Sequence, residues 1–412
     1  MIRSGGPGVY AFGDEERAQV NEVLESGYLS RYGSEDDSRF KHKVVTLERE
    51  FAKFVGVKHV VATSGGTMSI MCALASLGIG AGDEVIVPGY TFIASISSII
   101  MVNAIPVLAE IDDSLTIDPK KIEQCITQRT RCIMPVHMLG NPSDMDRIMA
   151  IAKKYGLYVL EDCCQSIGGT YKGKETGSIG AIGAYSLNVH KTISCGDGGM
   201  VATDDDELYE RAFGFHDQGH KPNRMGLEIG NRNIIGMNMR MNELSGAVAL
   251  AQLRKLPTIL HKLRESKKQL KDMLVGLPHF QFRRINDVDG ECATMLTMIF
   301  ETKDLAEKFG GAIGAKPLFA SGWHNYSNME QVLSKRTAMR AGCPYNCDKY
   351  PFGVSYGKGM LPQTDDILER SINVSVGVVD AGIGASYGIN LNSSPEEIAN
   401  VGENMRRILL SL

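Results

Sequence analysis

Short apolar runs alternate with amphipathic stretches between about residues 48 and 205, and this alternation decides the fold class. The runs have the length of strands, and they lie at 60–62, 84–87, 105–108, 132–136 and 158–160. Apolar residues at helical spacing follow several of them, as in 145–155. Such alternation predicts an α/β fold with a mostly parallel sheet and helices on both faces. A sheet of this kind binds ligands at the carboxyl ends of its strands.

The pattern changes after a long helical stretch at 243–275, in which Pro257 predicts a break. The residues that follow predict a smaller α+β domain with a strand at 294–300 and a closing helix at 395–410. We therefore divide the chain into an N-terminal segment, a large α/β domain and a smaller C-terminal α+β domain. Their expected bounds are 1–30, 31–255 and 256–412.

The composition is ordinary for a globular enzyme whose fold does not depend on disulfides or a structural metal. A chain of 412 residues with 43% hydrophobic and 22% charged residues can bury a large core without disulfides or a metal. The net charge of −4, without a basic stripe, argues against nucleic acid as a partner. We expect no membrane span, because polar residues interrupt the most apolar region, 93–109. The nine cysteines fit neither a zinc site nor a disulfide framework, so we expect reduced thiols in the cytoplasm.

The strongest chemical signal is the run 184–201, in which Lys191 lies between an apolar segment and a glycine-rich turn. A lysine condenses with an aldehyde only as the free amine, and burial favours that form. Upstream, Asp162 follows the apolar run 157–160. A carboxylate there can face the ring nitrogen of pyridoxal phosphate (PLP) and keep it protonated. The alternative roles are an exposed lysine and an aspartate that caps a helix.

A third signal is Ser-Gly-Gly-Thr at 64–67, directly before a helical pattern. Glycine permits close approach of the backbone, and the first amides of a helix attract an anion such as phosphate. An ordinary glycine turn is the alternative. Phe92 can stack on a flat ring or lie in the core. Gln165 can reach the cofactor from the start of a following helix or remain solvated. His137 and His190 are expected to be hydrogen-bonded structural histidines.

Taken together, a buried lysine, a buried acid and a phosphate-sized glycine loop predict a PLP site. These motifs resemble those of the DegT-type (StrS-like) sugar aminotransferases, which are fold type I PLP enzymes with a three-layer large domain. The resemblance covers nearly the whole chain. Its most specific segments are 82–88, 90–92, 161–166, 185–191, 196–201 and 238–244.

The resemblance implies a role for each candidate residue. Lys191 is the Schiff-base lysine, and Asp162 pairs with the pyridinium nitrogen. Phe92 and Gln165 flank the ring. The phosphate is bound by Gly66, Thr67 and Ser186, and by Asn238 of a neighbouring subunit, since such enzymes build each site across a homodimer.

The resemblance also implies an activity, the transfer of an amino group from glutamate or glutamine to a keto- or aldehydo-sugar by a ping-pong mechanism. Relatives that replace the lysine with histidine act as dehydratases, so Lys191 favours transamination. The chain departs from many relatives at Ser-Gly-Gly-Thr (64–67), where a second serine is usual, and at Gly-Asp-Gly-Gly (196–199), where glutamate is usual. The first departure removes one hydroxyl from the predicted phosphate site.

Other functions are still open at this stage. They are a PLP-dependent sugar dehydratase or epimerase, a non-catalytic PLP-binding regulator and a nucleotide-binding module. The insertion 30–45, together with 322–326, is similar to the branch that aminates an octulosonate sugar. Its basic residues either meet an acidic substrate or form a solvated charged segment; they are Arg31, Arg39, Lys41 and Lys43.

Overall fold

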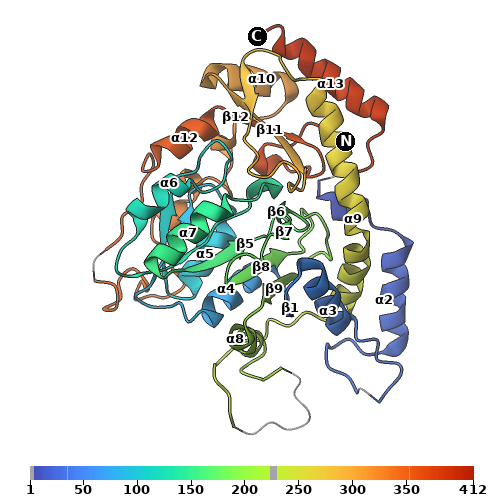
Figure 1. Cartoon of the computed structure of the whole chain (residues 1–412), viewed down its shortest axis with the longest axis vertical. Helices are drawn as coiled ribbons and strands as arrows, with labels where there is room; N and C mark the ends of the chain where they lie inside the picture. Colours follow the sequence, from blue (N-terminus) through green and yellow to red (C-terminus); the bar gives the residue numbers. More distant parts are fainter. Residues whose placement is uncertain (1–3, 35, 223–229, 352) are drawn as a thin grey trace.

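A seven-stranded sheet crosses the larger part of the molecule (Figure 1). The structure, a computed structural model, describes residues 4–34, 36–222, 230–351 and 353–412. The strands follow the order β1-β9-β8-β5-β4-β2-β3. They are β1 His59–Thr63, β2 Glu84–Pro88, β3 Ile105–Ala109, β4 Thr130–Ile133, β5 Tyr158–Asp162, β8 Ile182–Ser186 and β9 Gly199–Thr203. All neighbours pair in parallel except β9, which is antiparallel to both β1 and β8. The predicted mostly parallel sheet is confirmed.

Helices cover both faces of this sheet. They are α4 Gly66–Ser76, α5 Ile93–Met101 and α8 Asp206–His216 on one face, and α3 Lys43–Val55, α7 Met145–Tyr155 and α9 Glu243–Asp272 on the other. Neighbouring strand residues point to opposite faces, as the pleat requires. Val61 packs in one cluster with Ile70 of α4, whereas Val60 packs in another with Phe51 of α3. The expected three-layer α/β architecture is therefore present.

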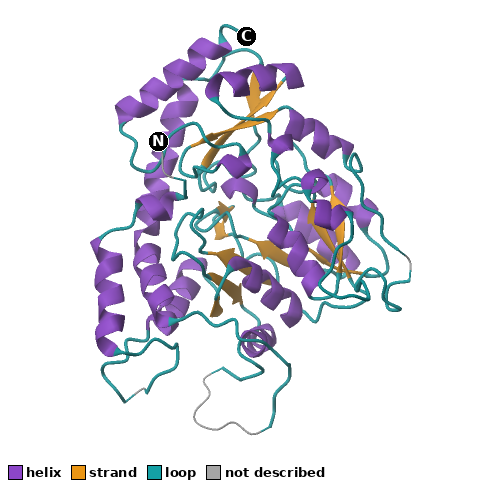
Figure 2. Ribbon diagram, turned by 180° about the vertical axis from the view of Figure 1, so that it is seen from behind, coloured by secondary structure: helices purple, strands orange, loops and turns teal. Residues whose placement is uncertain are grey.

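The C-terminal part of the chain adds a smaller antiparallel sheet, β10-β11-β12, covered by α10 and α13 (Figures 1 and 2). Its elements are β10 Phe280–Phe282, β11 Met295–Phe300, α10 Lys303–Ile313, β12 Ser371–Ser375 and α13 Pro395–Leu409. The sequence predicted β11 and α13 to within one residue. Helix α13 begins at a capping box, in which Ser394 and Glu397 satisfy each other's backbone amides.

Helix α9 continues through Pro257, so the predicted break is wrong. Proline removes one hydrogen-bond donor from a helix. Here Leu253, Leu256 and Leu260 bury the adjoining turns in the core, and this packing holds the helix together. The predicted domain boundary between residues 255 and 256 falls inside α9, and the division into domains stays a prediction.

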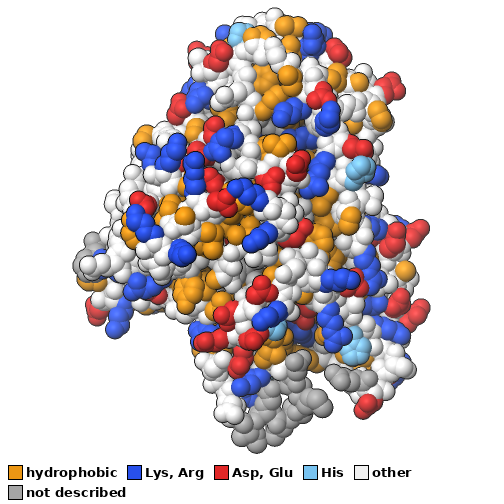
Figure 3. Space-filling view, viewed as in Figure 1, with side chains coloured by type: hydrophobic (Ala, Val, Ile, Leu, Met, Phe, Trp, Pro, Cys, Tyr) orange, Lys and Arg blue, Asp and Glu red, His pale blue; other side chains and the backbone are white. Residues whose placement is uncertain are grey.

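The remaining elements connect these layers. They are α1 Pro7–Tyr10, α2 Asp14–Ser26, α6 Pro119–Ile122, α11 Glu330–Leu333, α12 Pro362–Glu369, β6 Thr170–Tyr171, β7 Lys174–Glu175 and the 3-10 turns Glu123–Cys125, Met138–Gly140, Leu318–Ala320, Tyr326–Asn328 and Ala381–Ile383. Among the helices that the structure describes, none has the length and apolarity of a membrane span. All nine cysteines are free thiols, as expected. Basic and acidic side chains intermingle on the face shown in Figure 3.

Candidate active site

A cavity of about 240 Å³ lies at the carboxyl ends of the parallel strands. This is the edge at which such a sheet is expected to bind ligands. The cavity brings together every predicted site residue except Asn238. Its lining includes Gly66, Thr67, Phe92, Asp162, Gln165, Ser186 and Lys191.

Asp162 is the last residue of β5 and is held in the cavity wall by two hydrogen bonds. The Ser95 hydroxyl donates to Oδ2 at 2.6 Å, and the Cys164 amide donates to Oδ1 at 3.0 Å. Because Ser95 gives its proton to Asp162, it accepts one from Thr91, 2.7 Å away. These hydrogen bonds fix the orientation of the carboxylate. Each oxygen still has a lone pair for a group in the cavity.

The chain after Asp162 forms consecutive turns, so the helix predicted there is wrong. The Ser166 amide bonds the Cys163 carbonyl, and the Gly169 amide bonds the Ser166 carbonyl. Gly168 has a φ of +83°, which favours glycine and turns the chain away from a helical path. Asp162 therefore caps no helix, and its carboxylate is available to the cavity.

Lys191 lies in the turn after β8, and its side chain lines the same cavity as Asp162. Burial lowers the pKa of the Lys191 ammonium from its ordinary value, while the nearby Cys164, Asp162 and Asp380 oppose that shift. The loss of hydration is the larger effect, so the pKa is lowered overall. Lys191 is thus present as the free amine, the form that bonds an aldehyde, in a larger fraction of the molecules.

The amino end of α4 forms the anion-binding part of the cavity. Gly65 caps this helix without any side-chain hydrogen bond, so the first amides keep their capacity for a ligand. A Cβ on Gly66 would lie only 2.5 Å from the Cβ of Ser186. Glycine thus lets the helix start approach the end of β8, where the Thr67 and Ser186 hydroxyls line the cavity. This cradle, Asp162 and Lys191 fit the phosphate, ring nitrogen and aldehyde of PLP.

Phe92 and Gln165 lie on the cavity wall in different settings. Phe92 is 39% exposed, so it is no core aromatic, and its ring centroid lies 5.3 Å from that of His324. The Gln165 Oε1 accepts a hydrogen bond from the Leu139 amide at 3.0 Å. That bond fixes the Gln165 amide group in the wall rather than in solvent.

Asn238 does not line the cavity of its own chain. It is exposed, and its backbone pairs with Asp217 beside the end of β1. The predicted contact with a neighbouring subunit's phosphate stays a prediction, and an exposed position is compatible with it.

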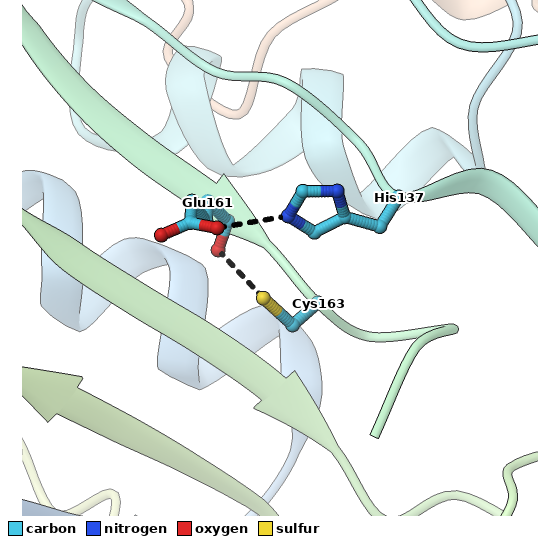
Figure 4. Close-up of side chains that lie close together, drawn as sticks. All are labelled: His137, Glu161 and Cys163. Carbon is cyan, nitrogen blue, oxygen red and sulfur yellow. Dashed lines mark hydrogen bonds and ion pairs between the residues drawn. The ribbon is translucent and has the colours of Figure 1, made fainter. Parts of the chain in front are cut away.

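A second group of polar side chains, His137, Glu161 and Cys163, lies next to Asp162 in the fold, but its hydrogen-bonding groups are bonded to one another and to the backbone (Figure 4). The Ser143 amide donates to His137 Nδ1 at 2.9 Å, so Nε2 carries the imidazole proton and donates to Glu161 Oε2 at 3.0 Å. Glu161 also accepts the backbone amides of residues 177, 179 and 180. With both nitrogens of the imidazole engaged, this cluster with Cys163 is a hydrogen-bonded structural unit. The structural role predicted for His137 is borne out.

The basic residues of the insertion are already paired within the chain. Arg31 bonds Glu48, Arg39 bonds Asp37, and Lys43 bonds Glu22. The Lys41 ammonium donates to the Ser38 carbonyl. Arg31 and Lys43 are also buried. These contacts account for the charges without an acidic substrate, and the two buried cations are not part of a solvated segment.

Several polar residues of the cavity were not predicted from the sequence as site residues, and two of them come from the C-terminal part of the chain. His324 and Asp380 belong to late segments of the chain and line the cavity close to Lys191. The sequence pattern carried no chemical signal for either residue. His324 lies in the segment 322–326, which was noted only for its resemblance to one branch of the family. Local patterns do not show that the C-terminal part folds back onto the large sheet.

Comparison with known proteins identifies the family. Residues 11–339 match the DegT/DnrJ/EryC1/StrS aminotransferase family. The chain belongs to the DegT/DnrJ/EryC1/StrS aminotransferase family. Its members depend on PLP, so the predicted cofactor is confirmed.

Individual relatives agree with this assignment. The chain is 40% identical over 242 residues to the GDP-perosamine synthase of Caulobacter vibrioides; the match covers 58% of this chain and 62% of that protein. The aminotransferase from Psychrobacter cryohalolentis superposes with a TM-score of 0.78 at 27% identity, over 97% of this chain and 98% of the other. GDP-4-keto-6-deoxymannose-3-dehydratase (ColD) has the same fold, with a TM-score of 0.76 at 22% identity over 96% and 98% of the two chains.

Proposed function

We propose that this protein transfers an amino group from glutamate or glutamine to a keto- or aldehydo-sugar. The observation that carries the proposal is the convergence of Lys191, Asp162 and the uncapped start of α4 on one cavity. The family match and the sugar aminotransferase relatives support it. The cytoplasm is the expected location.

Each residue has a separate task in this scheme. When bound, PLP supplies a ring that accepts electrons released at the substrate carbon. Asp162 holds the ring nitrogen protonated, and the α4 amides with Thr67 and Ser186 anchor the phosphate. Lys191 would hold the cofactor through its aldehyde group. The free amine of Lys191 would also move a proton to and from the substrate carbon.

A single-turnover experiment tests the reaction type. Holoenzyme is mixed with glutamate or glutamine, and the 2-oxo acid is counted before any sugar is added. A ping-pong aminotransferase releases up to one 2-oxo acid per site at this stage. The desalted enzyme then aminates a keto-sugar, which mass spectrometry detects. Release of 2-oxo acid only after the sugar is added would contradict the ping-pong order.

The alternative is a PLP-dependent dehydratase or epimerase, and the ColD likeness shows that the fold also serves a dehydratase. Such an enzyme would convert the sugar without consuming the amino donor. Lys191 favours the aminotransferase, because the family resemblance implies a histidine at this position for a dehydratase. A non-catalytic regulator would bind PLP and release no 2-oxo acid.

We further propose a homodimer in which Asn238 reaches the phosphate of the partner site. Lys191→Ala and Asn238→Ala variants, each impaired alone, are unfolded together and refolded as mixed dimers. If the site is shared, one site of the mixed dimer has both intact residues and activity returns. If Asn238 acts within its own chain, no mixed site is intact and activity stays low.

A further inference from the structure

Two segments of the chain, 321–324 and 380–382, lie in the cavity wall beside Lys191. A series of hydrogen bonds joins them. The Ser321 hydroxyl donates to the Gly382 carbonyl at 2.6 Å. The Gly382 amide donates to Asp380 Oδ1 at 2.7 Å. On the other side, Ser321 Oγ lies 3.3 Å from His324 Nδ1. The imidazole and the carboxylate therefore belong to one linked unit.

This chain of bonds fixes the tautomer of His324. A carbonyl oxygen only accepts, so the single proton of the Ser321 hydroxyl is committed to Gly382. Ser321 Oγ must then accept from His324, and Nδ1 carries the imidazole proton. In the neutral ring, Nε2 is left as a hydrogen-bond acceptor. In the part of the chain that the structure describes, no group donates to it.

The surroundings keep the ring neutral and in place. His324 is only 6% exposed, and burial lowers its pKa to about 3, with Lys191 and His190 adding to the effect. The Thr91 amide donates to the His324 carbonyl at 2.9 Å, and the Phe92 ring lies against the imidazole. The acceptor atom thus belongs to a fixed ring in the wall of the cavity.

We propose that His324 Nε2 accepts a hydrogen bond from a hydroxyl of the sugar, and that Asp380 accepts a second one. This inference rests on the proposed function and narrows its substrate class. Two acceptors that line one cavity recognise the O–H donors of a polyol. They offer nothing to a carboxylate, which has only acceptor oxygens. The unit therefore selects a hydroxylated acceptor over a simple keto acid.

The test separates the two half-reactions. Enzyme is first aminated with glutamate and desalted. The rate of amino transfer is then measured with three sugar probes, GDP-4-keto-6-deoxymannose, an octulosonate aldehyde and a cyclitol ketone, and with 2-oxoglutarate as the keto-acid probe. For the best sugar probe, His324→Phe is expected to lower kcat/KM by about 10- to 100-fold, the worth of one hydrogen bond to a buried acceptor. The effect on 2-oxoglutarate should be at least tenfold smaller.

Two further variants test the chemistry of the acceptor atom. His324→Gln places a carbonyl oxygen near the position of Nε2 and should restore most of the rate with sugar. Ser321→Ala frees Nδ1, so the proton can move to Nε2, and the sugar rate should fall while 2-oxoglutarate is affected less. His261→Gln serves as the matched control, because His261 is exposed on α9.

Three outcomes decide the matter. If the parent enzyme aminates no sugar probe, the proposed function fails and the subsite with it. If the parent enzyme is active but His324→Phe slows the reactions with the sugar probe and with 2-oxoglutarate equally, the proposed function stands and only the role of His324 in sugar binding is wrong. A direct readout is 15N NMR of histidine-labelled enzyme, in which the signal lost in His324→Gln should show an unprotonated Nε2 at neutral pH. A protonated Nε2 would overturn the inference even if the phenylalanine variant does not fold.

Discussion

Glu161 and Asp162 are adjacent carboxylates at the end of β5, yet they differ in almost every respect. The oxygens of Glu161 are occupied by His137 and by the backbone amides of residues 177, 179 and 180. Asp162 points to the other face of the sheet and keeps lone pairs open to a cavity. Both are buried. Burial alone therefore does not mark a functional acid; the open hydrogen-bonding capacity does.

The sharpest way to break this comparison is Asp162→Asn. The amide cannot hold the pyridine nitrogen protonated, so the ring accepts electrons poorly. We expect kcat to fall by roughly 10²- to 10⁴-fold, within the range for a positioned acid–base group. Steady-state rates measure the loss, and the denaturation midpoint should change little. A variant with near-normal kcat would remove Asp162 from the site.

Glu161→Gln should show the opposite pattern. Its amide nitrogen would face backbone N–H donors, and the charge-assisted bonds would be lost. We expect the free energy of unfolding to drop by about 3 kcal/mol. Activity per folded molecule should stay close to normal. Urea titration and rate measurement on the same sample distinguish the two effects, and a loss of kcat without a loss of stability would contradict the assignment.

Gly66→Ala probes the other end of the cofactor. The new Cβ would crowd Ser186, so the start of α4 must move away from β8. We expect PLP affinity to weaken by about tenfold, or about 1.4 kcal/mol. Gly311→Ala, a helical glycine with open space around it, is the control. Equal PLP affinities of both variants in a fluorescence titration would argue against the phosphate cradle.

The smallest expected effect concerns pH. Capture of PLP by the apoenzyme needs the free amine of Lys191, so its rate should rise with pH. Because burial lowers the pKa of Lys191, the rise should level off below 10.5, the ordinary value for lysine. Asp380→Asn removes a charge that raises this pKa, so the midpoint should move down by about one pH unit at most. Stopped-flow absorbance in amine-free buffers checks both midpoints.

The sequence predicted the large sheet and seven residues of the cavity wall because the signals are local. A strand followed by Asp162, and a glycine pair followed by a helix, place chemistry at one edge of a sheet. The turn after Asp162 was missed because Gly168 and Gly169 outweigh the expected β-α alternation. His324 and Asp380 could not be predicted, since their approach to Lys191 depends on how distant segments fold together. The role proposed for Asn238 involves a second subunit, which the sequence of one chain cannot reveal.

The central claim is that the ε-amino group of Lys191 bonds the cofactor in the cavity that Asp162 faces. Borohydride reduction of the holoenzyme fixes that bond, and peptide mass spectrometry then locates it. We predict the added mass of the reduced cofactor on the peptide that contains Lys191, and its loss in Lys191→Ala. The same mass on a different lysine, or an unchanged level of labelling in Lys191→Ala, would contradict the account.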